Sequence, residues 1–227
     1  MRFSNRAYKY LDRLKRDKDW TISDPKKLIN YLLEQNIPQF EKIIEFQTDF
    51  SGLELTISGK PGDNFKATLF SKSDIIENSP IDIIQINGQY YFNCGDHQTA
   101  QFWFVISDKG EIGTHDRNDN SVNIIFSAFE KLIETYSLVD KLISNRFHEY
   151  PAFFEIKDKA MLDSLTEGFT FHYTTNDNYN KWLSHGNLIF QQATWFDRPA
   201  PFIHIYGIDK ETCETFVNSL TNKRIIA

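Results

Sequence analysis

One stretch of the chain joins two different apolar spacings at a single glycine, and it limits the folds that the chain can adopt. It spans residues 36–57 and reads NIPQFEKIIEFQTDFSGLELTI. Its first half has helical spacing, carried by Ile37, Phe40, Ile43, Ile44 and Gln47. Its second half alternates as a half-buried strand does, with apolar residues at Leu53, Leu55 and Ile57. Gly52 predicts the turn from helix to strand, because glycine adopts positive φ without a Cβ clash.

The order of apolar patterns over residues 1–138 predicts an α+β domain, in which helices flank an antiparallel meander sheet. Helices are predicted over residues 3–14, 25–33, 37–47 and 125–133. Strands are predicted over residues 53–57, 65–69, 81–86, 90–92, 101–106 and 111–114. The segment 59–63 reads GKPGD and predicts a turn, and Asn87-Gly88 predicts a tight hairpin.

Residues 139–227 predict a second, smaller α+β unit, either appended to the first domain or packed with it as one body. Strands are expected over residues 153–156, 169–173, 188–191 and 201–206. Helices are expected over residues 157–165, 179–183 and 210–220, the last one capped by Asp209. We therefore place a domain boundary near residue 138.

The charge of the chain is unevenly distributed. Its 227 residues carry a net charge of -6. The first 24 residues hold seven Lys/Arg and four Asp, so 27 acidic and 18 basic residues remain for the rest. The basic leader has the apolar spacing of a helix that docks on the body. The acidic body argues against nucleic acid as a partner, because it repels phosphates, and it would attract a basic protein.

The cysteines and the apolar runs favour a cytoplasmic location. Cys94 and Cys213 are far apart in sequence and have no metal-binding spacing, so we expect two free thiols in a reducing compartment. The charged N-terminal segment lacks the apolar core of a secretory signal, and no run reaches the ~18 apolar residues of a membrane span. No association with a membrane is therefore expected.

Two short clusters are candidates for chemistry, Asp96-His97 and His115-Asp116, and both lie at predicted strand ends. A metal site needs three or more converging ligands, often at fixed helical or strand spacing, and neither cluster has such spacing. Turn hydrogen bonding explains most such residues. We therefore predict neither a metal nor a cofactor. A small hydrolase that uses Asp96, His97 and His115 stays open as a hypothesis, whereas Cys94 is interpreted as a buried, inert thiol rather than a nucleophile.

The acidic side chains of the first unit are the candidate partner-binding residues. A surface of this sign would speed the encounter with a basic partner and cover its functional groove. A solvated surface without a ligand is the alternative. The candidates are Asp74, Glu77, Asp82, Asp96, Asp108, Glu111, Asp116 and Asp119.

The pattern over residues 22–135 resembles the SMI1/KNR4 (SUKH) superfamily. The order consists of a helix, the motif IP-x-F-x-x-I-I-x-F, a helix-ending glycine, a strand pair, a Gly-Asp segment, an aromatic strand with a DKG turn, and a closing helix. The residues that carry the resemblance are Ile37, Pro38, Phe40, Ile44, Phe46, Gly52, Gly95, Asp96, Asp108, Gly110, Ser127, Phe129 and Leu132. The match covers about half of the chain and leaves the C-terminal unit outside it.

The resemblance implies a function without catalysis. Bacterial SUKH members are implied to be immunity proteins, which bind and neutralise polymorphic toxins, commonly nucleases with basic active sites, in the cytoplasm. Eukaryotic members suggest an alternative, an interaction scaffold in signalling or in cell-envelope regulation. We therefore expect an immunity protein that is not an enzyme and that occludes a basic toxin domain.

Overall fold

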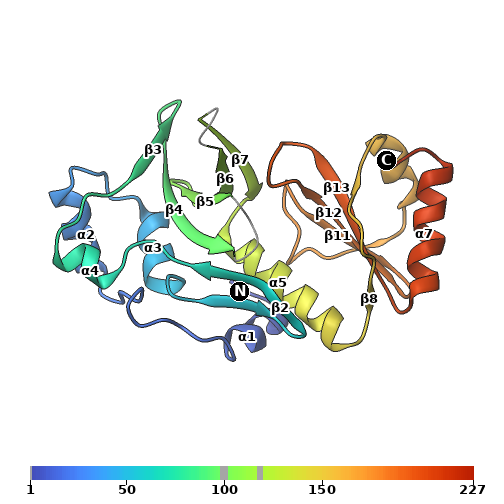
Figure 1. Cartoon of the computed structure of the whole chain (residues 1–227), viewed down its shortest axis with the longest axis horizontal. Coiled ribbons are helices and arrows are strands. Elements are labelled where there is room, and N and C mark those ends of the chain that lie inside the picture. Colours follow the sequence, from blue (N-terminus) through green and yellow to red (C-terminus); the bar gives the residue numbers. More distant parts are fainter. Residues whose placement is uncertain (1, 98–101, 117–119) are drawn as a thin grey trace.

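A computed structural model describes residues 2–97, 102–116 and 120–227. Two antiparallel sheets lie side by side along the long axis of the molecule, and helix α5 (Phe129–Ser144) passes from the first sheet to the second (Figure 1). The predicted α+β class is confirmed.

The first sheet has the strand order β1-β2-β4-β5-β6-β7, with β3 paired to β4. Its strands are β1 (Glu54–Ile57), β2 (Lys60–Ala67), β3 (Ile83–Ile86), β4 (Gln89–His97), β5 (Trp103–Ser107), β6 (Ile112–Asp116) and β7 (Ser121–Phe126). The two halves of β4 have different partners, because its start pairs with β3 and its end pairs with β2. The hairpin at Asn87-Gly88 is confirmed, and both residues have positive φ.

Helices cover the first sheet and share its core with the strands. They are α1 (Asn5–Leu11), α2 (Pro25–Glu34), α3 (Glu41–Asp49), α4 (Lys72–Ile76) and α5. Aromatic rings from two helices and one strand meet in the centre of this core. Phe46 of α3 and Phe65 of β2 both pack on Phe129 of α5. The predicted turn at Gly52 is also confirmed. This residue has φ +92° and follows the end of α3.

The second sheet has the strand order β10-β11-β12-β13-β8, with β9 also paired to β13. Its strands are β8 (His148–Glu149), β9 (Phe154–Glu155), β10 (Thr170–Phe171), β11 (Lys181–His185), β12 (Leu188–Thr194) and β13 (Pro201–Gly207). Helices α6 (Lys159–Leu165) and α7 (Lys210–Asn222) belong to this unit. Asp209 caps α7 as predicted, because its side chain accepts a hydrogen bond from the backbone N–H of Thr212.

The two units share buried side chains. Trp182 of β11 and Tyr206 of β13 belong to the same buried cluster as the core of the first sheet. The boundary expected near residue 138 lies inside α5, which is continuous from Phe129 to Ser144. The chain passes to the second sheet after Asn145, the residue that ends this helix.

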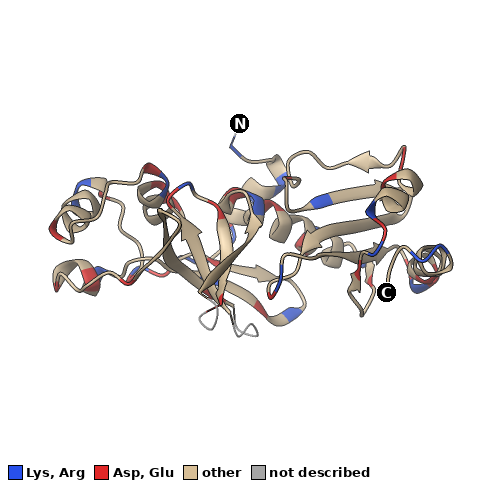
Figure 2. Cartoon of the chain, turned by 90° about the horizontal axis from the view of Figure 1, so that it is seen from above, with Lys and Arg blue, Asp and Glu red and all other residues tan. Residues whose placement is uncertain are grey.

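The basic leader docks on acidic side chains of α5. Arg2 pairs with Glu130, and Arg13 pairs with Asp140. Figure 2 shows that Lys and Arg are interspersed with Asp and Glu along the chain. Part of the acidic charge of the body is therefore neutralised within the molecule.

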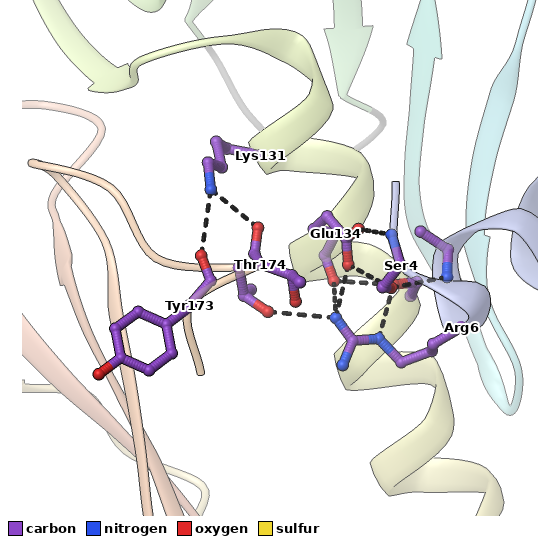
Figure 3. Close-up of polar contacts among 9 residues, drawn as sticks. Ser4, Arg6, Lys131, Glu134, Tyr173 and Thr174 are labelled. Atoms are coloured by element: carbon purple, nitrogen blue, oxygen red, sulfur yellow. Dashed lines mark hydrogen bonds and ion pairs between the residues drawn. The ribbon is translucent and has the colours of Figure 1, made fainter. Parts of the chain in front are cut away.

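The most buried of these pairs joins Arg6 to Glu134 at 2.7 Å (Figure 3). Glu134 is only 2% exposed, and its carboxylate also accepts hydrogen bonds from the backbone N–H and the hydroxyl of Ser4. The guanidinium of Arg6 donates in addition to the hydroxyl of Thr175, and Lys131 donates to the carbonyl of Thr174. This cluster ties the leader, α5 and the second unit together.

Two predicted elements of the first unit differ from the structure. Residues 60–63 belong to β2 rather than to a turn, because the chain reverses at Ser58 and Gly59. Ile125 and Phe126 end β7 rather than begin a helix, since Phe126 pairs with Ile112 and α5 begins only at Phe129. The short helix α4 was not predicted.

One predicted element of the second unit also differs. The helix expected over residues 179–183 is wrong, because Lys181–His185 form β11. Five residue pairs with β12 settle the conformation of this segment, and Trp182 is fully buried there. A run this short fits both spacings, so its pairing with β12 determines its conformation.

We predict that Gly52→Ala destabilises the chain by about 2 kcal/mol or more, because alanine resists the positive φ and its Cβ would lie 2.5 Å from the carbonyl oxygen of Asp17. Gly88→Ala is the matched control, since Gly88 has φ +80° but no atom within 4 Å of the added Cβ. It isolates the conformational cost of about 1 kcal/mol. Urea unfolding measures both variants. Equal losses would show that the contact with Asp17 does not restrict this turn.

We predict that Glu134→Ala destabilises the chain by about 3 kcal/mol, because it leaves a largely buried guanidinium without its partner. Glu130→Ala removes a partner of Arg2 on the same helix that is more exposed than Glu134, and it should cost less than about 1 kcal/mol. Thermal and urea unfolding report both changes. If the two variants lost the same stability, the buried pair would not hold the leader in place.

Candidate functional site

The predicted acidic residues lie in three separate places. Asp74 and Glu77 belong to α4 and its C-terminal end, and Asp82 precedes β3. Asp108 and Glu111 flank the turn between β5 and β6.

The third place is the opposite end of the first sheet, where Asp96 lies near the end of β4 and Asp116 ends β6. Asp119 lies outside the described residues. Asp116 follows Glu111 by five positions along the extended chain, which corresponds to about 16 Å. The candidates therefore do not form one continuous acidic surface.

Some of these carboxylates have structural contacts. Asp74 completes a capping box at the start of α4, where its side chain accepts a hydrogen bond from the backbone N–H of Ser71. Glu111 accepts hydrogen bonds from Gln89 and Ser107. Glu77, Asp82, Asp96 and Asp116 are exposed.

The residues of the hydrolase hypothesis, Asp96, His97 and His115, do not converge. Paired residues on neighbouring antiparallel strands point to the same face of a sheet. His97 pairs with Phe65, whose ring lies 5.1 Å from that of Phe104, so His97 shares the face of Phe104. His115 pairs with Trp103, which adjoins Phe104 in sequence and therefore points to the other face. The sheet separates the two histidines.

Both cysteines are free, as predicted, and both are buried, which was predicted for Cys94 alone. Burial raises the pKa of the Cys94 thiol far above its ordinary value. Such a thiol is protonated at neutral pH and cannot act as a nucleophile.

A cavity of about 700 Å³ lies between the two sheets. Strands of the first sheet contribute Phe65 and Phe104, and strands of the second contribute Phe202 and Tyr206. Helix α5 lines another wall with Leu132, Tyr136 and Val139. The volume and the apolar, aromatic lining are typical of sites for small molecules.

One wall of the cavity carries a continuous chain of polar contacts. His97 contacts Asp63 at 3.2 Å, and Lys60 lies 3.7 Å from Asp63. Lys60 also pairs with Glu149, and this contact links the first sheet to the second. Glu149 contacts His204 at 3.1 Å, and the other ring nitrogen of His204 contacts the hydroxyl of Tyr206 at 3.1 Å. We call His97, Asp63, Lys60, Glu149, His204 and Tyr206 the polar wall.

The polar wall keeps its two carboxylates ionised. The hydrogen bond with His97 is the main cause that lowers the pKa of Asp63, and Lys60 adds to it. Burial alone would raise the pKa of Glu149, yet His204 and Lys60 lower it below its ordinary value. Burial raises the pKa of Tyr206 well above its ordinary value, so its hydroxyl stays protonated. In the wall, each carboxylate thus lies between Lys60 and a histidine ring.

Comparisons with known proteins give this chain no relative: no family model matches it, and no curated protein and no solved structure matches it either. Within the described residues, no three His, Cys, Asp or Glu side chains are grouped as a metal site requires. In the same part of the chain, no helix has the length and apolar character needed to cross a membrane.

Sequence reasoning found His97 but missed Asp63, Lys60, Glu149 and His204. Lys60 and Asp63 were interpreted as parts of a turn, although they lie on β2. Glu149 and His204 belong to strands of the second sheet, far away in sequence. No local spacing relates these residues, so only the meeting of the two sheets could reveal them.

We predict that the polar wall contributes stability that is lost in acid. Asp63 and Glu149 have folded pKa values below their ordinary values of 3.8 and 4.5, so their contribution is complete above these values and disappears as the pH falls below them. Lys60→Gln should flatten the loss of Tm between pH 6 and pH 3, because it reduces the lowering of both pKa values.

Lys159→Gln is the control for this measurement, since Lys159 forms an exposed pair with Asp163 on α6. Calorimetry across this pH range should give this variant the wild-type slope. A wild-type slope in Lys60→Gln would show that Lys60 does not stabilise the ionised wall.

Proposed function

We propose that this chain is an immunity protein, which binds a cognate toxin domain and occludes its active site without catalysis. The order of elements over residues 22–135 is the observation that carries the proposal. Helix α2 is followed by the IP motif, α3, Gly52 and the β1–β2 pair. Then come the Gly95-Asp96 segment in β4, the turn at Asp108 to Gly110 after β5, and α5. This order parallels the SUKH resemblance of the sequence.

The placement of the histidines favours binding over hydrolysis. An acid–base pair must reach one substrate from one side. His97 and His115 point to opposite faces of the first sheet, and Cys94 is buried and protonated at neutral pH. The three residues of the hydrolase hypothesis, Asp96, His97 and His115, therefore do not face one substrate from the same side of the sheet.

The end of the molecule that carries α2 and α4 is the surface that we propose for the partner (Figure 1). Each of these helices exposes a large apolar side chain: Leu33 is 54% exposed and Ile76 is 82% exposed. Glu77 and Asp82 lie close by in sequence and are also exposed. Protein interfaces commonly combine an apolar centre with a polar rim, and the acidic rim would attract a basic toxin.

The test is coexpression with the toxin encoded beside this gene, followed by calorimetry of the purified pair. We expect a stoichiometric complex and protection of the cells. Glu77→Lys combined with Asp82→Lys should weaken binding about tenfold or more and slow association, because it reverses the charge of the rim.

The matched control is Asp96→Lys combined with Asp116→Lys, which makes the same change of charge at the far end of the first sheet. It should keep wild-type binding. The absence of both a complex and protection would overturn the immunity function. Loss of binding in the control alone would overturn the proposed surface.

A further inference from the structure

We propose that the cavity between the two sheets binds a neutral, mainly apolar organic molecule that carries a hydrogen-bond acceptor. This inference goes beyond the proposed function and does not depend on it. The surface proposed for the toxin lies at the α2–α4 end, whereas the cavity lies between the sheets.

The size of the cavity is the first argument. Protein interiors are close-packed, and voids larger than a water molecule are few. A space of about 700 Å³ lined by Phe65, Phe104, Phe126 and Phe202 forfeits packing that larger side chains would supply. Ala193, on β12, adjoins this space and could be larger without any change of strand. A ligand that fills the cavity recovers the lost contacts.

The charge of the polar wall is the second argument. Each carboxylate already has cationic or histidine partners: Asp63 has Lys60 and His97, and Glu149 has Lys60 and His204. Both ring nitrogens of His204 are engaged within the protein. Each charged group of the wall therefore already has partners within the protein, and a charged ligand would lose its hydration without a free partner there. A neutral ligand fits best.

An unsatisfied donor is the third argument. Trp195 lines the cavity, and its indole N–H is buried without a hydrogen-bond partner within the described residues. Buried tryptophan N–H groups normally have a partner. The ring is held in place, because Asn123 donates to the carbonyl of Trp195 and the ring packs on Phe202 at 4.7 Å. An acceptor oxygen on a ligand would satisfy this donor.

The rim of the cavity offers access from solvent. Phe196, Asp197 and Arg198 lie in the connection between β12 and β13, line the cavity and are exposed. Phe153 is 47% exposed and stacks on His204 at 4.1 Å between ring centroids. These side chains belong to short connections, so a ligand can enter without separation of the sheets.

The test uses two neutral fluorescent probes with the full chain. Prodan has an apolar body and a carbonyl acceptor, and N-phenyl-1-naphthylamine has a similar body without the carbonyl. We expect both probes to bind with saturation at one site, with blue-shifted emission and a raised Tm. Ala193→Phe should weaken both about tenfold, because the added ring occupies the cavity. Trp195→Phe should weaken prodan alone by about three- to tenfold, because it removes one hydrogen bond.

Ile76→Ala controls for dye on exposed apolar surface and should leave both affinities unchanged. Thr194→Phe is a second filling variant at the cavity wall, to be used if Ala193→Phe does not fold. Absence of saturable binding, or unchanged binding in the folded filling variant, would overturn the site. Equal effects of Trp195→Phe on the two probes would overturn the requirement for an acceptor.

Discussion

The buried ion pair between Arg6 and Glu134 is the contact on which the arrangement of the whole chain depends. A carboxylate that is 2% exposed is costly unless its partners are complete, and here they come from the leader. Arg6 then extends the same cluster to Thr175 in the second unit. If the leader left α5, the buried carboxylate of Glu134 would lose its partner Arg6, and Thr175 of the second unit would lose its hydrogen bond with Arg6. The two sheets are therefore coupled through one helix.

This coupling changes the interpretation of the uneven charge distribution along the sequence. A basic leader and an acidic body suggest an acidic exterior that is free to meet a partner. In the folded chain, Arg2, Arg6 and Arg13 pair with carboxylates of α5, and Lys66 pairs with Asp17 of the leader. Long cationic side chains reach carboxylates that are far away in sequence, so a tally along the chain overstates the free negative charge. For the proposed recognition of a basic partner, local groups such as Glu77 and Asp82 would therefore matter more than the net charge.

The sequence predicted correctly those parts of the fold that depend on the local backbone and on neighbouring residues. Gly52, the Asn87-Gly88 hairpin and the cap at Asp209 depend on backbone conformation and on contacts with near neighbours, and all three were predicted. The segments at 125–126 and 179–183 depend on pairing with β6 and β12, which no short apolar run specifies. The polar wall was missed for the same reason. Its groups come from four strands, and only the meeting of the two sheets brings them together.

The cavity follows from how the two sheets are joined. Around it, side chains of one unit bond to backbone or side-chain groups of the other: Asn123 to the carbonyl of Trp195, Asn180 to the carbonyl of Ile125, and the hydroxyl of Ser127 to Asp177. Hydrogen bonds tolerate little change in length or angle, so they fix the distance between the sheets. Apolar packing alone would favour collapse of the interior, because each contact is weak and without direction. The three hydrogen bonds between the units resist that collapse, so the apolar cavity persists as a property of the fold.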